Sequence, residues 1–346
     1  MTPILSTHDV RKYFPLKAGF FARKRRRHVH AVDGVTLDIL ENETLALVGE
    51  SGSGKSTLGQ LLLGLQEPSD GTVEWSGTPL TSLTKEQRRQ FRRDVQVVFQ
   101  DPYGSLNPRM TVRSIIGRPL QLHRFGDAAE IEREVGRLLE LVGLSPASAY
   151  IDRFPHEFSG GQRQRIAIAR ALALKPRVIV ADEPVSALDV SIRAQILLLL
   201  TTLRREFGLS MLFTTHDLGV VRYIADRVAV MYLGKIVEIA PSDVFFRSTQ
   251  HPYSQMLLSS SLSPNPDVKL SARKFSVQGE PPSPIDPPSG CRFRTRCPFA
   301  YARCEIEEPL LRRVDPSHFS ACHLDKFERR GEHMHSMQAQ SANPAC

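Results

Sequence analysis

The chain has 346 residues, of which 41% are hydrophobic and 24% are charged, a balance that is ordinary for a soluble globular protein. No apolar run approaches the ~18–20 residues of a membrane span, and the first residues lack the basic-then-apolar layout of a signal peptide. The composition therefore excludes a membrane-embedded chain and predicts a cytosolic protein, in which structural disulfides are rare.

The first 43 residues indicate strands, and the alternating segment VDGVTLDI at residues 32–39 is the clearest example. A basic run, ARKRRRH, occupies residues 22–28 and contributes to the net charge of +8. Such runs are typical of surfaces that contact anionic lipids or nucleic acid, and equally of solvated loops. The charge alone therefore assigns no function.

The first chemical motif lies between a predicted strand, Thr44–Val48, and a predicted helix. GESGSGKST at residues 49–57 matches the G-x-x-x-x-G-K-[ST] phosphate loop, whose backbone N–H groups point inward at an anion. Lys55 is expected to reach the β- and γ-phosphates, and Ser56 to bind Mg²⁺. The alternative, a Gly/Ser-rich turn without a ligand, is disfavoured by the full match. The expected nucleotide-binding residues are Gly49, Glu50, Ser51, Gly52, Ser53, Gly54, Lys55, Ser56 and Thr57.

A helical region follows and contains a second candidate anion site. The apolar residues of EIEREVGRLLELVGL, at 130–144, have helical spacing. In HEFSGGQRQRIAIARA, at 156–171, Ser159 is expected to cap a helix whose two glycines allow a close backbone approach. Helix starts of this kind attract phosphate. The candidate residues are Ser159, Gly160, Gly161 and Gln162.

Two acidic residues end the next predicted strand, Val178–Ala181. Asp182 is expected to hold Mg²⁺ through water, and Glu183 to orient or polarise the attacking water. An acidic surface cap is the alternative. The phosphate loop upstream favours the catalytic interpretation.

The remaining elements complete an alternation of helices and strands. The predicted helix at 193–206 is apolar enough that we expect it to be mostly buried, and a strand is predicted at Met211–Thr215. Residues 227–240 indicate a hairpin that turns at Leu233–Gly234. The alternation predicts an α/β fold with a largely parallel sheet covered by helices.

Together these motifs resemble the ATP-binding-cassette (ABC) ATPases, because FSGGQ at residues 158–162 is similar to their signature sequence, with Phe158 in place of the commoner Leu. The resemblance implies a P-loop nucleotide-binding domain with a RecA-like core, an antiparallel β subdomain and an α-helical subdomain at about 101–170. It also implies a head-to-tail dimer, in which the signature of one subunit covers the γ-phosphate held by its partner.

The resemblance implies further site residues. Gln100 would reach Mg²⁺ and the attacking water, His216 would contact the γ-phosphate, and Asp189 would lie at the dimer interface beside Glu183. The segment DPYGSLNP, after Gln100, resembles the part of the cassette that touches membrane subunits.

An aromatic ring that stacks on adenine is also expected by this resemblance, upstream of Lys55. The place where the family has this ring falls in the basic run, so the segment Leu16–Arg27 resembles an insertion. The ring is then expected from Tyr13, with His28 as the alternative.

The composition changes near residue 249, and GEPPSPIDPPSGC is a stiff, Pro-rich connector. This tail, with HPYSQMLL before it, resembles the C-terminal extension of the oligopeptide/dipeptide (Opp/Dpp) importer branch, and of its F-type subunit in particular. We therefore expect an ABC ATPase domain at 1–248, the extension at 249–327 and a disordered tail at 328–346.

Four of the five cysteines, Cys291, Cys297, Cys304 and Cys322, are close together in the extension. Independent thiols, disulfides, a zinc site and an iron–sulfur cluster are the alternatives, and the cytosolic compartment disfavours disulfides. Zinc usually takes at least one pair spaced by two to four residues, which is lacking here, whereas iron–sulfur clusters accept wider spacings. Because members of the resembled branch carry a [4Fe–4S] cluster at such cysteines, that cluster is the expectation.

The resemblance implies an ATP-hydrolysing subunit, peripheral on the cytoplasmic face of the bacterial inner membrane, that powers peptide import. Its expected partners are a second ATPase subunit, in a heterodimer or alternatively a homodimer, two permease subunits and, indirectly, a substrate-binding protein. A soluble ABC ATPase acting on DNA or ribosomes is the alternative, but such proteins usually carry two cassettes or long coiled coils. No nucleic-acid partner is therefore expected, and the transported substrate is not encoded in this chain.

Overall fold

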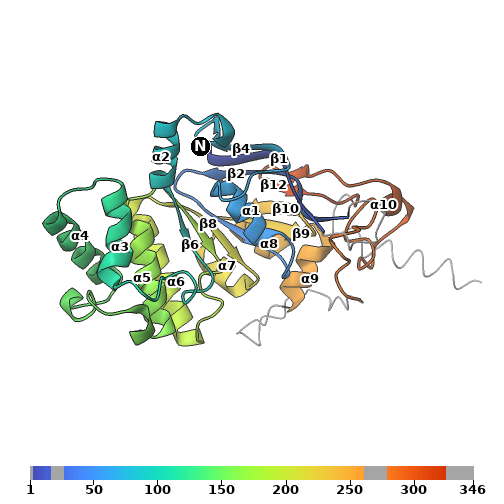
Figure 1. Cartoon of the computed structure of the whole chain (residues 1–346). Coiled ribbons are helices and arrows are strands. Elements are labelled where there is room, and N and C mark those ends of the chain that lie inside the picture. Colours follow the sequence, from blue (N-terminus) through green and yellow to red (C-terminus); the bar gives the residue numbers. More distant parts are fainter. Residues whose placement is uncertain (1–2, 17–26, 261–278, 325–346) are drawn as a thin grey trace, which may run out of the picture.

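The computed structural model describes residues 3–16, 27–260 and 279–324. Its centre is an eight-stranded sheet in the order β11-β12-β10-β9-β3-β8-β7-β6 (Figure 1). Strands β9, β3, β8, β7 and β6 pair in parallel, so the prediction of a largely parallel sheet is confirmed. The strands are β3 Thr44–Val48, β6 Val95–Val98, β7 Val178–Asp182, β8 Ser210–Thr215, β9 Arg227–Tyr232, β10 Lys235–Pro241, β11 Arg312–Asp315 and β12 His318–Ser320.

A second, antiparallel sheet has the order β2-β1-β4-β5, with strands β1 Pro3–Pro15, β2 His28–Leu40, β4 Asp70–Trp75 and β5 Thr78–Pro79. Helix α1, Lys55–Leu62, packs between the two sheets, because its buried leucines share one hydrophobic cluster with residues of both. Most of the predicted insertion and basic run, the tail at 328–346 and Cys346 lie outside the described residues.

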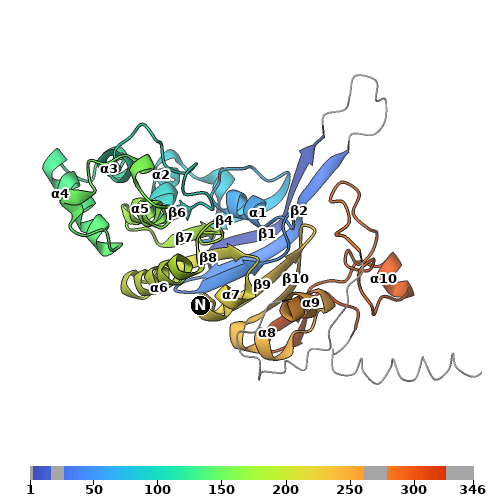
Figure 2. The same cartoon turned by 90° about the horizontal axis from the view of Figure 1, so that it is seen from below.

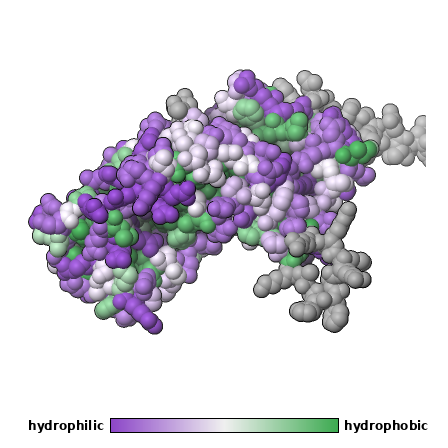
Figure 3. Space-filling model, turned by 45° about the horizontal axis from the view of Figure 1, so that its top comes forward, coloured by the Kyte–Doolittle hydropathy of each residue, from purple (hydrophilic) through white to green (hydrophobic). Residues whose placement is uncertain are grey.

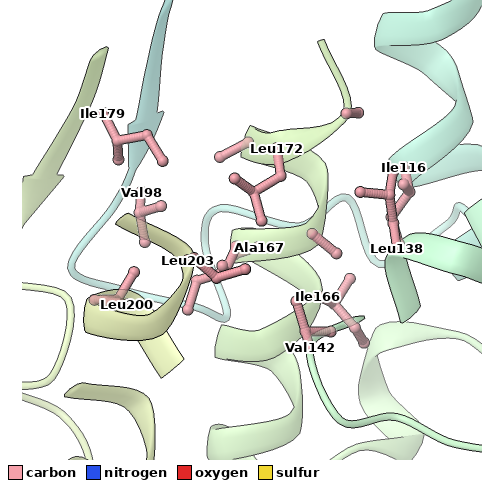
Figure 4. Packing of buried hydrophobic residues seen from close by; sticks show 14 of the residues in the cluster. Val98, Ile116, Leu138, Val142, Ile166, Ala167, Leu172, Ile179, Leu200 and Leu203 are labelled. Atoms are coloured by element: carbon pink, nitrogen blue, oxygen red, sulfur yellow. The ribbon is translucent and has the colours of Figure 1, made fainter. Parts of the chain in front are cut away.

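The helical part of the molecule lies at one end of the main sheet, where α3, α4 and α5 gather (Figures 1 and 2). Figure 4 shows its core, in which Ile116 of α3, Leu138 of α4 and Ile166 of α5 approach one another. The helices are α2 Lys85–Asp94, α3 Val112–Leu122, α4 Ala128–Leu141, α5 Gly160–Leu172, α6 Val190–Phe207, α7 Leu218–Ile224, α8 Ser242–Ser248, α9 Pro252–Ser260 and α10 Ala302–Ile306.

The prediction that the helix around 193–206 is mostly buried is wrong. Only Ile196, Leu197, Leu200 and Leu203 of α6 are buried, and Leu198 is 58% exposed. Apolar residues are present all around this helix, but only one of its faces meets the core. The apolar composition of α6 therefore led to too high a predicted burial. Which of its residues are buried depends on the elements that pack against the helix, not on its composition.

The C-terminal extension continues the main sheet across the expected boundary at residue 248. Strand β12 pairs antiparallel with β10, where Ile239 lies opposite Phe319. The fully buried Glu238 carboxylate accepts hydrogen bonds from the backbone N–H groups of Gln250 (2.6 Å) and His251 (3.0 Å). Its Oε1 also lies 2.6 Å from Nε2 of His318, which is itself 1% exposed. The extension is thus joined to the cassette by backbone pairing and by a buried polar cluster.

The face drawn in Figure 3 is mainly hydrophilic, with apolar residues in separate patches. In the described ranges, exposed large apolar side chains such as Leu65, Leu122 and Leu310 come from different segments. None of the helices in these ranges combines the length and apolar character that a membrane crossing requires.

Candidate nucleotide-binding site

The site lies at the carboxyl ends of four neighbouring parallel strands, β3, β8, β7 and β6. The phosphate loop follows β3, Gln100 follows β6, Asp182 ends β7 with Glu183 directly after it, and His216 follows β8. Because parallel strands end at the same edge of a sheet, this order brings together residues that are far apart in the sequence.

Two glycines of the phosphate loop are required by close backbone approaches. A Cβ on Gly49 would lie 2.2 Å from the carbonyl oxygen of Met231, and one on Gly54 would lie 2.1 Å from that of Ala31. Gly54 also has a φ of 110°, which side-chain-bearing residues rarely adopt. The backbones of β2 and β9 therefore pack directly against the phosphate loop.

The side chain of Lys55 is folded into the loop and is 5% exposed. Its Nζ donates hydrogen bonds to the carbonyl oxygens of Gly49 (2.8 Å) and Glu50 (3.0 Å), and lies 3.9 Å from Oε1 of Glu183. Burial lowers the pKa of Lys55, whereas the carboxylates of Glu183 and Asp182 act in the opposite direction. The ammonium group thus lies next to Glu183, the residue that follows β7.

A hydroxyl and a carboxylate form a pair that suits Mg²⁺. Ser56 Oγ donates to Oδ1 of Asp182 at 3.1 Å, and Thr214 Oγ1 donates to the same oxygen at 2.6 Å. Mg²⁺ prefers oxygen ligands of this kind and keeps several waters. Thr214 was not predicted from the sequence; the signal was a polar residue at the end of a buried strand beside β7.

Glu183 is the centre of the expected catalytic group. Its Oε2 accepts a hydrogen bond from Gln100 Nε2 at 3.2 Å and lies 3.5 Å from Nδ1 of His216. The backbone of Glu183 has a φ of 44°, and its N–H donates to Oγ1 of Thr214 at 3.0 Å. Left-handed backbone at a non-glycine residue is a strained conformation that functional sites often retain. The structure thus gathers Gln100 and His216 at Oε2 of Glu183, whose Oε1 lies next to Lys55.

The signature residues form a separate helix start. Ser159 Oγ accepts from the N–H of Gln162 at 3.3 Å, and Gln162 Oε1 accepts from the N–H of Ser159 at 3.0 Å. Asp189 precedes α6 without a capping hydrogen bond from its side chain. Over the described ranges, no hydrogen bond or ion pair joins Ser159–Gln162 or Asp189 to Gly49–Thr57. The phosphate loop and the signature residues of this chain therefore share no such contact among the described residues.

Tyr13 belongs to the antiparallel sheet, opposite His30, and the centroids of the two rings are 4.5 Å apart. Its hydroxyl donates to Oδ1 of Asp33 at 2.6 Å. Burial and this hydrogen bond raise the pKa of Tyr13 to about 12. His28 lies one pleat further along, opposite Pro15. His30 was not predicted as a neighbour of Tyr13, because the strand register is not visible in the sequence.

The four cysteines lie in the extension, where the N–H of Cys291 donates to the carbonyl oxygen of Cys304 at 2.9 Å. Burial is the largest cause that raises the pKa of Cys291 to about 11 and that of Cys297 to about 12, and the neighbouring cysteines act in the same direction. The four thiols are thus within electrostatic range of one another. Among the described residues, however, no three His, Cys, Asp or Glu side chains form a group that could hold a metal ion.

Comparison with known proteins decides the family. Residues 32–186 match the family model described as ABC transporter, and residues 237–304 match that of the oligopeptide/dipeptide transporter C-terminal region. The chain is 49% identical over 322 residues to the oligopeptide transport ATP-binding protein AppF of Bacillus subtilis (strain 168), covering 93% of this chain and 97% of AppF.

The chain belongs to the ABC transporter ATPases. This ABC ATPase is also 43% identical over 327 residues to the di/tripeptide transport ATP-binding protein DppF of Pseudomonas aeruginosa (strain UCBPP-PA14), covering 94% of this chain and 99% of DppF. Among solved structures, it resembles a dimeric, post-hydrolysis state of the ATP-binding cassette MJ0796 bound to ADP and Pi. The TM-score is 0.60 and the identity 30%, over 69% of this chain and 98% of that one. The predicted cassette fold and its oligopeptide/dipeptide branch are thereby confirmed.

Proposed function

We propose that this ABC ATPase binds and hydrolyses ATP to power the import of di- or oligopeptides through membrane permease subunits. The observation that carries the proposal is the convergence of Lys55, Ser56, Asp182 and Glu183 at one sheet edge. The oligopeptide/dipeptide C-terminal region and the peptide-transport relatives support the choice of substrate class.

In the proposed mechanism, backbone N–H groups of Gly49–Thr57 and the Lys55 ammonium bind the phosphates. Ser56, Asp182 and Gln100 would hold Mg²⁺, which would supply positive charge that offsets the phosphate charge. Glu183 orients the attacking water and takes up its proton at a carboxylate oxygen. Gln100 and His216, both next to Glu183 Oε2, hold that carboxylate in place.

We propose a head-to-tail dimer in which Ser159, Gly160, Gly161, Gln162 and Asp189 act on the nucleotide of the partner subunit. The separation of the two motifs within one chain supports this arrangement. In the proposed transporter, this chain forms a heterodimer with a second ATPase subunit and binds two permease subunits, which in turn receive substrate from a substrate-binding protein. The chain lies at the cytoplasmic face of the inner membrane. The proposed division of the chain is 1–248, 249–327 and 328–346, although β12 links the first two parts.

The test is reconstitution with the permease subunits, the second ATPase subunit and the binding protein in proteoliposomes. Peptide-loaded binding protein should stimulate ATP hydrolysis and peptide uptake together. Hydrolysis that responds to DNA or ribosomes, and not to the permeases, would assign the chain to the alternative class of soluble ABC ATPases.

Tyr13 is the proposed adenine-stacking residue. Tyr13→Ala should weaken ATP binding about tenfold, since aromatic–base stacking contributes ~1–3 kcal/mol. Tyr13→Phe should bind ATP nearly as well as the native chain, because the ring remains. Isothermal titration of the three proteins measures this. If His28→Ala loses ATP affinity and Tyr13→Ala does not, the stacking residue is His28.

We also propose that Cys291, Cys297, Cys304 and Cys322 bind a [4Fe–4S] cluster, with zinc as the alternative. The gathering of four of the five cysteines in the extension, and the backbone hydrogen bond from Cys291 to Cys304, support this proposal. Protein purified without oxygen should contain about four iron atoms and absorb visible light. Cys297→Ser should lose both signals. One zinc ion per chain and no iron would establish a zinc site instead.

A further inference from the structure

The phosphate loop is held from outside the cassette by the extension, through the seven-residue segment 291–297, called here the cysteine turn. Figures 1 and 2 both show the extension beside β9 and β10, at the end of the sheet away from α3 and α4. The turn carries three arginines between Cys291 and Cys297, and two of them, Arg292 and Arg296, contact the cassette. The side chains of both are 8% exposed; Arg292 pairs with Asp33, and Arg296 pairs with Glu50 of the phosphate loop.

Arg296 holds the beginning of the phosphate loop. Its Nη1 and Nη2 donate to Oε2 and Oε1 of Glu50 at 2.8 Å and 3.1 Å, a two-pronged ion pair. Such paired geometry fixes direction as well as distance. The N–H of Glu50 donates in turn to the hydroxyl of the buried Tyr253 at 2.8 Å, so residues beyond the cassette hold both the backbone and the side chain of Glu50.

Arg292 holds the other part of the loop through the hairpin between β9 and β10. It donates to the carbonyl oxygen of Leu233 and to the carboxylate of Asp33. The N–H of the next residue, Gly234, donates to the carbonyl oxygen of Ser53 at 2.8 Å. Arg292 therefore positions the turn that binds Ser53, four residues before the end of the loop.

The contact of Arg292 with Asp33 also reaches the proposed adenine-stacking residue. Burial would raise the pKa of Asp33, but the hydrogen bond from Tyr13 and the charge of Arg292 outweigh it and lower that pKa to about 2. Asp33 is thus ionised at neutral pH, with Arg292 on one oxygen and Tyr13 on the other. The cysteine turn accordingly contacts Glu50 in the phosphate loop and also Asp33, the hydrogen-bond partner of Tyr13.

The cysteine turn is itself anchored in the hydrophobic core. Phe293, between the two arginines, is 1% exposed and packs against Tyr232 (5.3 Å between ring centroids) and Tyr253 (5.5 Å). The N–H of Arg296 donates to the carbonyl oxygen of Phe293 at 3.0 Å. The arginines are therefore fixed relative to the sheet and do not extend from a free strand.

We propose that Arg292 and Arg296 are positioning residues, through which the C-terminal extension keeps the phosphate loop in its nucleotide-binding shape. The proposal rests on ATP binding at this loop, as proposed above. It makes nucleotide affinity of the cassette dependent on the folded state of the cysteine turn. Neither arginine is among the proposed nucleotide-binding or catalytic residues, so their loss should act on binding more than on the chemical step.

The experiment measures the dissociation constant of the full chain for a non-hydrolysable ATP analogue with Mg²⁺. Arg296→Ala should raise it about tenfold, as expected for loss of a charged hydrogen-bond pair, with kcat at saturating ATP changed less than about twofold. Arg296→Lys keeps the charge but not the two-pronged geometry. Its dissociation constant should therefore lie between those of the native chain and the Arg296→Ala protein. Arg294→Ala is the matched control, because Arg294 is in the same turn but donates to Ser289.

A double-mutant cycle with Glu50→Ala separates the ion pair from a general loss of structure, since Arg296→Ala should have little effect once Glu50 is absent. Equal affinity of the Arg296→Ala and Arg294→Ala proteins would overturn the proposal, as would independent, multiplicative effects in the cycle. If Arg296→Ala does not fold, the comparison of Arg296→Lys with Arg294→Ala decides. Absence of analogue binding by the native chain would instead refute the proposed function, and this inference with it.

Discussion

Glu183→Gln should lower kcat for ATP hydrolysis by about 10²–10⁴-fold, the usual contribution of a positioned general base. The amide cannot take up a proton, but it keeps the shape of the side chain and its neighbours Gln100 and His216. ATP binding should therefore persist, and the proposed dimer should stay closed on its nucleotide. Phosphate release and size-exclusion chromatography with ATP measure the two effects.

The control for this variant is Glu206→Gln, which changes an exposed carboxylate near the end of α6. It should hydrolyse ATP at the native rate. Normal turnover by the Glu183→Gln protein would show that another group activates the water, and would remove Glu183 from the catalytic assignment.

His318→Ala should lower the free energy of unfolding by about 3 kcal/mol, because it leaves the fully buried Glu238 without its side-chain partner. Two backbone N–H groups still reach Glu238, so the carboxylate keeps part of its solvation by the protein. A loss of this size is a large fraction of a typical domain stability of about 5–15 kcal/mol. Urea unfolding followed by circular dichroism gives the value.

His8→Ala is the matched comparison, because it removes a His–Glu pair from the surface. His8 Nε2 lies 3.4 Å from Oε2 of Glu74, and the two side chains are 52% and 24% exposed. Exposed pairs contribute about 0–1 kcal/mol, so this variant should unfold at nearly the native urea concentration. If His318→Ala and His8→Ala lower the free energy of unfolding equally, the buried His318–Glu238 pair stabilises the fold no more than an exposed pair.

The sequence predicted the cassette fold well because its signals are local. The phosphate loop is nine consecutive residues, and the hairpin at Leu233–Gly234 is marked by its turn residues. The convergence of Gln100, Glu183 and His216 followed from motif order, and the structure adds its cause, since all three follow neighbouring parallel strands.

Contacts between distant segments could not be predicted in the same way. Arg296 and Glu50 are 246 residues apart, and no pattern around either residue indicates the other. The same holds for Thr214 beside Asp182 and for His30 beside Tyr13, which depend on strand pairing and register. The exposure of Leu198 depends on what packs against α6, which composition does not reveal.

The pairing of β12 with β10 has a consequence for how the chain is made. His318 and Glu238 are 80 residues apart, so the ribosome completes the hairpin of β9 and β10 long before its last neighbour emerges. During that interval the outer edge of β10 has unpaired backbone groups, and such edges invite pairing with other chains. We therefore expect the nascent chain to be prone to aggregation from the time β10 emerges until β12 pairs with it.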